Sequence, residues 1–249
     1  MNRSDYGATF EQRGLSYAAA NQRWPHARRE ERAWLLADAA PVSGERVIDA
    51  PAGSGYMAAG LRQMVAPPDL LCVEPTAVFA RMLGRLPAVR ARLDALPVRA
   101  ASADLVTSLA GLHHEPDVRP FLAEAARVLR PGGRLALAEV AAGTAVADFL
   151  EGTVDAWCAT GHRGHYYDLD GWHAHCSAAG LDVERAVQRR LRWHFADVQA
   201  MVRFCTALFS LQAPAARVLD QLQADLGWQA DGAGVHLRWE LAYRVARKS

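Results

Sequence analysis

Two acidic side chains, Asp49 and Glu74, each end a short apolar run of the sequence. The first run leads into residues 50–55, APAGSG, and such a glycine turn lets backbone amides approach a ligand closely. Glu74 follows the turn by about 20 residues, a spacing at which a carboxylate can accept both hydroxyls of a ribose. The turn lacks the GxGxxG that accommodates a pyrophosphate. The pattern predicts a ligand that contains adenosine but is not a dinucleotide.

The elements that would position these acids alternate between strand and helix. Apolar runs predict strands at 46–49, 69–74, 103–109 and 134–140. Helical patterns separate them, and Pro131-Gly132-Gly133 stops the helix before the last of these strands. Alternation at this pitch predicts an α/β fold with a doubly wound, mostly parallel sheet of seven strands.

This alternation of strands and helices predicts four parts within one compact domain. Helical cover is expected over 1–40, and the cofactor-binding core over 41–141. Residues 142–180 are predicted to form a helical and loop cap over the substrate, which is the insertion after the fifth strand. Residues 181–249 complete the sheet, with a helical insertion between the last two strands at 181–195 and 235–246.

Together these motifs resemble the class I S-adenosylmethionine-dependent methyltransferases, in a small-molecule branch. An acid followed by GxGxG is the first motif of that superfamily, and VIDAPAGSG is similar to it with Pro51 in place of the first glycine. LLCVEP resembles the second motif, ADLVTSLAGLHHEPD the fourth-strand motif, and RVLRPGGRLALAEV the helix and strand that follow. The resemblance covers about residues 40–141. It implies a Rossmann-like fold and S-adenosylmethionine as the cofactor.

The resemblance also implies which residues hold this cofactor. Asp49 would lie near the methionine amino group, Glu74 would hold the ribose hydroxyls, and Leu109 would lie beside the sulfonium. Arg92 stands where the superfamily often has an acid for adenine, so Asp94 or the backbone around Leu93 would take that role. The other cofactor contacts that the resemblance implies are Ala50, Pro51, Ala52, Gly53, Gly55, Pro75 and Leu93.

Two histidines are candidates for catalysis. His113 follows the fourth predicted strand, where open α/β sheets bind their ligands, and could accept a proton. Alternatively, the pair His113-His114 only packs and caps there. His165 belongs to residues 162–167, which we expect to form a substrate-facing loop. Asp168 or Asp170 would cap the helix behind that loop.

Three tyrosines complete the catalytic candidates. Tyr166 and Tyr167 could hold electron-rich ring faces against the sulfonium cation. The alternative is core packing with a hydroxyl hydrogen bond. Tyr17 is the aromatic residue that we expect the N-terminal helix to close over the site, with Phe10 as its alternative.

The histidine-rich stretch 161–176 does not predict a metal site. His173 and His175 are two positions apart on a predicted helix and point in different directions. His162 and His165 lack the i, i+4 helical context of a zinc pair. We therefore expect no metal.

Three arginines of the N-terminal segment have two interpretations. Arg13, Arg28 and Arg29 could bind a carboxylate. They could also form a solvated face whose charges pair with nearby glutamates. The glutamates concerned are Glu30 and Glu31.

Composition limits the classes of protein to which the chain can belong. In 249 residues, 28 Lys and Arg balance 27 Asp and Glu, which argues against a dedicated nucleic-acid binder. The four cysteines include no CxxC, so neither a disulfide framework nor a thiolate zinc site is indicated. The start has no apolar signal region, and no run is long enough to cross a membrane. We expect a cytoplasmic protein without a nucleic-acid or membrane partner.

Three functional hypotheses follow from the motifs and the resemblance. The first is a methyltransferase for a small organic molecule in bacterial secondary metabolism, because large segments outside the core would cover the acceptor. The second is a cyclase of the azetidine-2-carboxylate synthase type, in which the cofactor's own amino group attacks its γ-carbon and releases methylthioadenosine. The third is a non-catalytic module that binds S-adenosylmethionine. The acceptor and the oligomeric state are not indicated.

Overall fold

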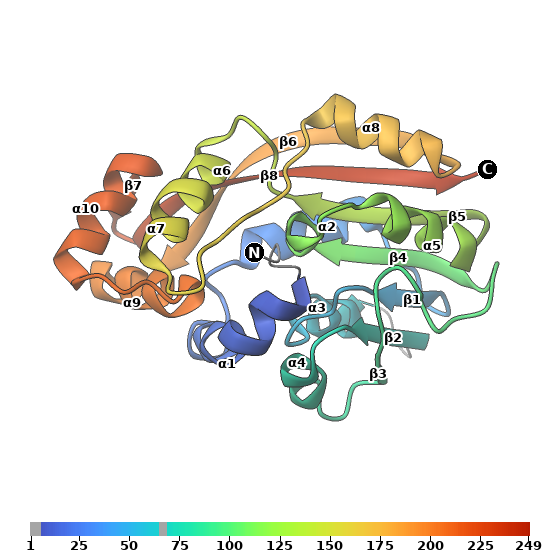
Figure 1. The fold of residues 1–249 in the computed structure, drawn as a ribbon, viewed down its shortest axis with the longest axis horizontal. Helices are drawn as coiled ribbons and strands as arrows, with labels where there is room; N and C mark the ends of the chain where they lie inside the picture. Colours follow the sequence, from blue (N-terminus) through green and yellow to red (C-terminus); the bar gives the residue numbers. More distant parts are fainter. Residues whose placement is uncertain (1–5, 65–68) are drawn as a thin grey trace.

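A computed structural model describes residues 6–64 and 69–249, so the predicted N-terminal cover is seen from Tyr6 onward. Parallel strands form one half of its sheet (Figure 1). In the strand order β3-β2-β1-β4-β5, β1 and β4 lie next to each other near the centre, and each has a hydrogen-bonded strand on both sides. These strands are β1 (Arg46–Asp49), β2 (Asp69–Glu74), β3 (Ala88–Arg90), β4 (Ala103–Leu109) and β5 (Leu129–Glu139).

Antiparallel strands complete the sheet beyond β5. The 15-residue β8 (Gly234–Lys248) pairs with β5, and the 15-residue β6 (Leu181–Phe195) pairs with β8. The short β7 (Trp228–Asp231) also pairs with β8, which brings the sheet to eight strands among the described residues. The prediction of seven strands missed β7. The prediction of a mostly parallel, doubly wound sheet is confirmed.

Alternate residues of the central strands face opposite layers of helices. Val47 belongs to the same core cluster as Leu35 of α2 (Arg29–Ala39), whereas its neighbour Ile48 belongs to a second cluster with Phe121 of α5 (Arg119–Val128). Burial on both faces explains why these strands read as continuous apolar runs. The two layers of helices therefore cover both faces of the sheet and hold the carboxyl ends of its strands in position.

Helices occupy the segments between strands largely as predicted. α1 (Tyr6–Arg23) and α2 are separated by the turn that contains Pro25, because proline cannot continue a helix. The insertion between β6 and β8 is mainly helical. Before β6, Asp168 caps the helix that starts at Leu169 by accepting from the Gly171 amide at 2.7 Å. The remaining helices are α3 (Tyr56–Met64), α4 (Ala77–Met82), η1 (Leu112–His114), α6 (Ala145–Phe149), the π-helical η2 (Leu150–Val154), α7 (Asp155–Trp157), α8 (Leu169–Ala178), α9 (Val198–Phe209) and α10 (Ala215–Asp225).

The segment Pro131-Gly132-Gly133 differs from its prediction. Strand β5 begins at Leu129 rather than Arg134, and it ends at Glu139 rather than Val140. Leu129 pairs with Ala103, and the pairing resumes between Arg134 and Leu105. The glycines therefore bulge out of a continuing strand, and the helix ends earlier, at Val128.

The two long antiparallel strands extend past the rest of the sheet. Only residues Ala242–Arg247 of β8 pair with β5, and the amino-terminal part of β8 pairs with the last residues of β6 and with β7. This two-stranded extension carries α9 and α10, at the left of Figure 1. In the part of the chain that the structure describes, no helix is both long and apolar enough to span a membrane.

Candidate functional site

Two adjoining cavities lie at the carboxyl ends of the parallel strands. The first, here the glycine-loop cavity, is lined by Pro51, Ala52, Gly53 and Leu109 among others. The second, here the histidine cavity, includes His113 in its wall. Phe10, Tyr17, Arg28 and Ala110 line both cavities, so the two spaces are neighbours.

The glycine turn places backbone amides beside the acid of the next strand. Gly53 has φ +53°, which an L side chain rarely adopts, and its amide donates to Glu74 Oε2 at 2.8 Å. Gly55 has φ +88° but does not line either cavity. A Cβ on Gly55 would lie 3.0 Å from Leu86 Cδ1, so a side chain here would require Leu86 to shift in addition to the strain of the positive φ.

Glu74 is fully buried and both of its oxygens accept hydrogen bonds from the protein. Oε1 accepts from the amide of Thr76 at 2.8 Å and from its hydroxyl at 2.7 Å. Oε2 accepts from Gly53 and from the hydroxyl of Tyr6 at 3.0 Å. Burial raises the pKa of Glu74, and these hydrogen bonds oppose that shift. Tyr6, which the sequence analysis did not single out, thus donates a hydrogen bond to the acid that is predicted to bind the ribose.

Asp49 is equally buried but is not fully satisfied. Its Oδ1 accepts from the Thr107 hydroxyl at 2.9 Å, while Oδ2 has no hydrogen-bond partner among the described residues. Burial raises the pKa of Asp49 to about 7. An orphaned carboxylate oxygen at the end of β1 indicates a missing donor, such as the amino group of a ligand.

The other predicted cofactor residues divide into two groups. Pro51, Ala52, Gly53 and Leu109 line the glycine-loop cavity. Ala50 and Leu93 are buried in the core, and Pro75 lies outside both cavity walls. Their predicted contacts with the cofactor stay predictions. Asp94, the alternative acid for adenine, is bound by Arg92 at 2.7 Å on the surface.

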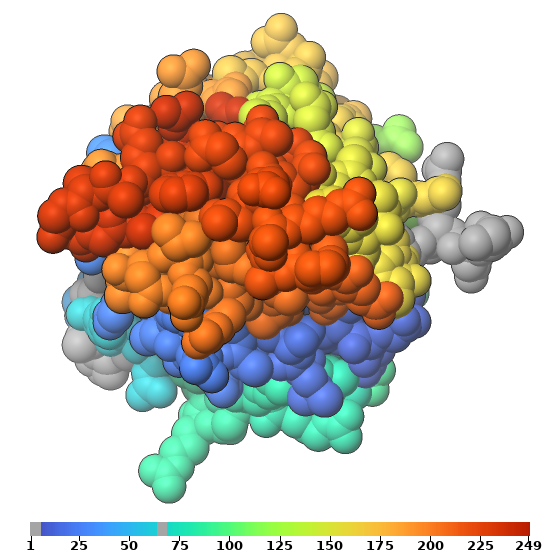
Figure 2. All heavy atoms as spheres, turned by 90° about the vertical axis from the view of Figure 1, so that its left-hand side faces the viewer, coloured from blue at the N-terminus to red at the C-terminus, as the bar shows by residue number. Residues whose placement is uncertain are grey.

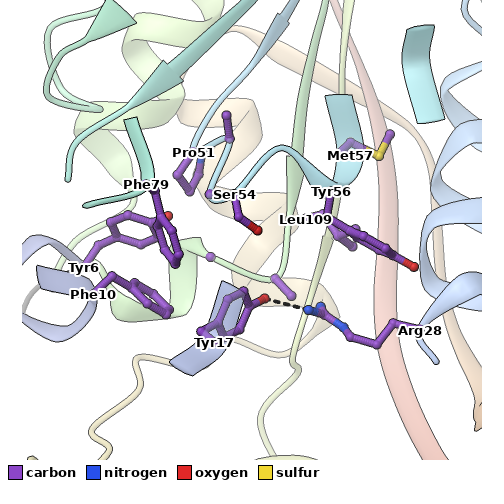
Figure 3. A pocket seen from close by; sticks show the side chains of 14 residues that line it. Tyr6, Phe10, Tyr17, Arg28, Pro51, Ser54, Tyr56, Met57, Phe79 and Leu109 are labelled. Atoms are coloured by element: carbon purple, nitrogen blue, oxygen red, sulfur yellow. Dashed lines mark hydrogen bonds between the residues drawn. The ribbon is translucent and has the colours of Figure 1, made fainter. Parts of the chain in front are cut away.

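A buried network separates the two cavities. Arg28 pairs with Glu31 through its Nη2 at 2.7 Å and donates from Nη1 to the hydroxyl of Tyr17 at 2.6 Å (Figure 3). Glu31 also accepts from the indole of Trp193 at 2.6 Å. Figure 3 shows Tyr6, Phe10 and Phe79 clustered on the opposite side of Tyr17 from Arg28. Tyr17, predicted to close the site, therefore stands between the two cavities.

The predicted solvated face of arginines is wrong for two of its members. Arg13 and Arg28 are each only 5% exposed, because α1 and the start of α2 fold over the sheet edge and carry these side chains inward. The pairing of Glu31 with Arg28 is observed, but in the interior. Arg13 lines the histidine cavity, and its Nε and Nη1 have no hydrogen-bond partner among the described residues.

His113 is oriented by a buried carboxylate that ends β5. Its Nδ1 lies 2.9 Å from Glu139 Oε2, while Glu139 Oε1 accepts from the amides of Gly111 and Leu112 at 2.9 and 2.8 Å. A carboxylate on Nδ1 holds the proton there and leaves Nε2 as the acceptor. Glu139 ends its strand as Asp49 and Glu74 end theirs, and this shared position was the signal that could have identified it.

Three histidines meet in the wall of the histidine cavity. His113, His114 and His162 are buried, and their nearest ligand nitrogens lie within 4.8 Å of one another. Burial lowers the pKa of His114 and of His162 well below the ordinary value, so both are neutral imidazoles. His162 comes from the predicted substrate-facing loop, where its amide donates to Asp155 Oδ1 at 2.7 Å.

The remaining catalytic candidates lie behind or beside this cavity. Tyr166 stacks on His113 with ring centroids 5.7 Å apart, and burial raises the pKa of its hydroxyl. Tyr167 packs against Trp172 and His175, away from both cavities. The amide of His165 donates to the carbonyl of His113 at 2.7 Å. Tyr166, Tyr167 and His165 line a separate surface hollow rather than the glycine-loop cavity or the histidine cavity, and their predicted role at the sulfonium stays a prediction.

Comparison with known proteins identifies the family. A family model described as a methyltransferase domain matches residues 48–137, the segment that carries both acids and the glycine turn. The 27-O-demethylrifamycin SV methyltransferase of Amycolatopsis mediterranei is 42% identical over 93 residues, which are 36% of this chain and 34% of that protein. The chain thus spans about a third of the length of the first curated relatives that it matches.

Two longer alignments extend beyond this segment. The uncharacterized protein YafE of Escherichia coli is 31% identical over 140 residues, which are 56% of this chain and 67% of that protein. The solved structure of BH2331 from Bacillus halodurans has a TM-score of 0.65 at 20% identity, and covers 88% of this chain and 99% of that one. The chain belongs to the class I S-adenosylmethionine-dependent methyltransferases, whose cofactor is S-adenosylmethionine.

Proposed function

We propose that the protein transfers the methyl group of S-adenosylmethionine to a small organic molecule held in the histidine cavity. The observation that carries this proposal is the shared wall of the two cavities. Phe10, Tyr17 and Ala110 face both spaces, so a molecule in the histidine cavity adjoins the contents of the glycine-loop cavity. Proximity of the two reactants is the main requirement of a displacement reaction.

The residues of the glycine-loop cavity fit the cofactor together with Asp49 and Glu74, two buried acids that are not themselves part of the cavity wall. When bound, S-adenosylmethionine supplies an electrophilic methyl group on a sulfonium. Asp49 Oδ2, which lacks a partner, would accept from its amino group. Glu74 would accept from the ribose hydroxyls once the hydroxyl of Tyr6 leaves it. Gly53 lines this cavity in a backbone conformation, with φ +53°, that favours glycine.

His113 would serve as the proton acceptor. Glu139 holds its Nδ1–H, which directs the basic Nε2 lone pair away from β5. As a nucleophilic oxygen or nitrogen of the acceptor gains the methyl group, its proton would pass to Nε2. Glu139 would then stabilise the imidazolium that forms. Proton transfer of this kind contributes about 10²–10⁴-fold to a rate.

The helices around the histidine cavity favour a small acceptor over a macromolecule. α1 and α9 supply Phe10, Leu208 and Phe209 to its wall. Figure 2 shows that residues of α9 and α10, in orange, form a continuous surface with the blue N-terminal helix on this side. The Amycolatopsis relative is named for its acceptor, 27-O-demethylrifamycin SV, which supports an organic compound as the acceptor and a role in secondary metabolism.

The experiment is a mass-spectrometric assay of purified protein with S-adenosylmethionine and a library of small organic molecules. We expect S-adenosylhomocysteine to form only with particular acceptors, each gaining 14 Da for the methyl group. The reaction without an acceptor is the decisive control. Methylthioadenosine in that control would contradict methyl transfer and support intramolecular cyclisation. Intact cofactor with every compound would support a binding module instead.

A further inference from the structure

Arg13 is a buried cation, and no carboxylate of the described residues forms an ion pair with it. Its guanidinium belongs to α1, is 5% exposed and lines the histidine cavity. Nε and Nη1 have no hydrogen-bond partner among the described residues. Guanidinium groups stay charged in proteins, and burying an unpaired charge is among the most costly features a fold can have. Such a group indicates a partner that comes from outside the chain.

Two other buried arginines can be compared with Arg13. Arg28 is held by Glu31 at 2.7 Å and by the hydroxyl of Tyr17. Arg244 lies 5.3 Å from the ring centroid of Trp172 and lines neither cavity, although two of its nitrogens also lack hydrogen-bond partners. Arg13 differs from both because its unpartnered nitrogens belong to a residue of a cavity wall.

The charges of the histidine cavity favour an anion. No aspartate or glutamate is among the described residues that line it. Glu139, the nearest buried carboxylate to His113, lies behind that ring and is satisfied by two amides and the imidazole. His114 and His162 add N–H donors but no charge, because burial keeps them neutral. The free charge of this cavity is therefore positive.

A metal ion fits this site less well. Tetrahedral zinc with Zn–N bonds of about 2.0–2.1 Å brings its ligand nitrogens to about 3.3 Å from one another. The three histidines would have to move closer from separations of up to 4.8 Å. A divalent cation would also be repelled by Arg13, whose charge already acts on His114 and His162.

Most of the other residues that line this cavity are aromatic or aliphatic. Trp193 and Trp239 stack with ring centroids 4.0 Å apart, and Phe209 stacks on Trp239 at 6.1 Å. Leu150 and Leu208 also line the cavity. Such a surface favours a ring or a short hydrocarbon body.

We propose that the acceptor is a small organic acid whose carboxylate binds Arg13 and whose apolar body packs on Trp239 and Phe209. The carboxylate would fix the molecule so that its nucleophilic atom faces His113. The inference rests on the proposed function, because it names the substrate class of the same cavity. What the inference adds to the proposed function is that the acceptor carries a negative charge.

Binding of matched acids and amides tests this charge. Phenylacetate with phenylacetamide, and indole-3-acetate with indole-3-acetamide, would be titrated calorimetrically into protein saturated with S-adenosylhomocysteine. Wild type should bind each acid about tenfold or more tightly than its amide, because a charge-assisted bidentate contact is strong. Arg13→Gln should abolish that preference, and Arg13→Lys should restore part of it. Arg203→Gln removes an exposed arginine of α9 and should leave the preference unchanged.

A second measurement does not depend on the probe chosen. Arg13→Met removes a buried charge that lacks a partner, so the ligand-free variant should melt at a higher temperature than wild type. A lower melting temperature would mean that Arg13 has a structural partner, and would overturn the proposal. Equal affinities of wild type for acid and amide would overturn it as well.

Two controls separate this inference from the proposed function. Failure of wild type to bind S-adenosylhomocysteine would contradict the proposed function itself. Normal binding of S-adenosylhomocysteine without any preference for acids would contradict only the anionic acceptor. Acid binding that EDTA removes and Zn²⁺ restores would also overturn the role of Arg13, because a metal would then hold the carboxylate.

Discussion

The hydroxyl of Tyr6 donates to Glu74 Oε2 over 3.0 Å, across 68 positions of the sequence. The same oxygen accepts from the Gly53 amide, and the family resemblance assigns it to the ribose of the cofactor. Tyr6 therefore offers this carboxylate the kind of donor that a ribose would offer. Cofactor binding has to exchange one hydroxyl hydrogen bond for another, and α1 competes with the ligand for Glu74.

Removing the hydroxyl of Tyr6 should favour the cofactor. Tyr6→Phe leaves Oε2 short of one donor in the free protein, at a cost in folding free energy of about 1–2 kcal/mol. The ribose would then bind without displacing a hydrogen bond. We expect S-adenosylhomocysteine to bind several-fold more tightly by calorimetry while the melting temperature falls. Weaker binding would mean that Tyr6 contacts the cofactor directly.

Removing the charge of Glu74 should do the opposite. Glu74→Gln replaces one acceptor oxygen by an NH₂ group, which cannot accept from a ribose hydroxyl. We expect the cofactor to bind more weakly by about 1.5–3 kcal/mol in a titration. Glu184→Gln, at an exposed ion pair with Arg247, is the matched control and should bind normally. Unchanged binding by Glu74→Gln would place the ribose elsewhere.

Cofactor affinity should depend on pH through Asp49. Burial raises its pKa from an ordinary value of 3.8 to about 7, so Asp49 is largely protonated below pH 7 in the folded protein. A protonated carboxyl gives an ammonium group no charge partner. Affinity for S-adenosylhomocysteine should therefore rise as the pH increases from about 5.5 to 7.5. Asp49→Asn should bind weakly at every pH and lose this dependence.

The same shift has a consequence for folding. Between pH 3.8 and about 7 the folded protein holds a proton on Asp49 that the unfolded chain has already released. Asp49 therefore destabilises the fold progressively as the pH rises through this interval. Asp49→Asn should reduce the loss of unfolding free energy that denaturant titrations measure between these pH values. An identical pH profile in the variant would show that Asp49 ionises normally.

The dyad of His113 and Glu139 should affect turnover more than cofactor binding. With an acceptor found in the library assay, we expect His113→Gln to lower kcat by about 10²-fold or more. S-adenosylhomocysteine should bind it as it binds wild type. Glu139→Gln should lower kcat and shift the pH profile, because the imidazole loses its orienting carboxylate. Full activity of His113→Gln would limit this residue to packing.

Regular elements were predictable because local patterns determine them. Strand β1, strand β2 and helix α8 begin where the apolar runs and the capping aspartate indicated. The bulge after Leu129 was not predictable, because its glycines are typical both of a turn between a helix and a strand and of a bulge within a strand. β7 has four mostly exposed residues and pairs only through its hairpin with β8, so its apolar pattern was too weak to detect.

The glycine-loop residues were predictable because one short segment supplies most of them. The histidine cavity was not, because its wall combines residues from α1, the segment that follows β4, the 158–167 segment and the β6–β8 extension. Arg13 lies three positions after Phe10 and four before Tyr17, on one helical face, and that spacing could have identified it. Its burial depends on how α1 packs, which no local pattern contains.

The extension of β6 and β8 beyond the sheet has a consequence for how such an enzyme changes during evolution. Trp193, Trp239 and the helix α9 form the apolar wall on this extension, whereas Asp49 and Glu74 belong to the parallel half. Mutations in the apolar wall can therefore change the acceptor cavity while leaving Asp49 and Glu74 in place. A lineage could acquire new acceptors by remodelling the extension alone, and a directed-evolution library confined to it should retain the ability to use the same methyl donor.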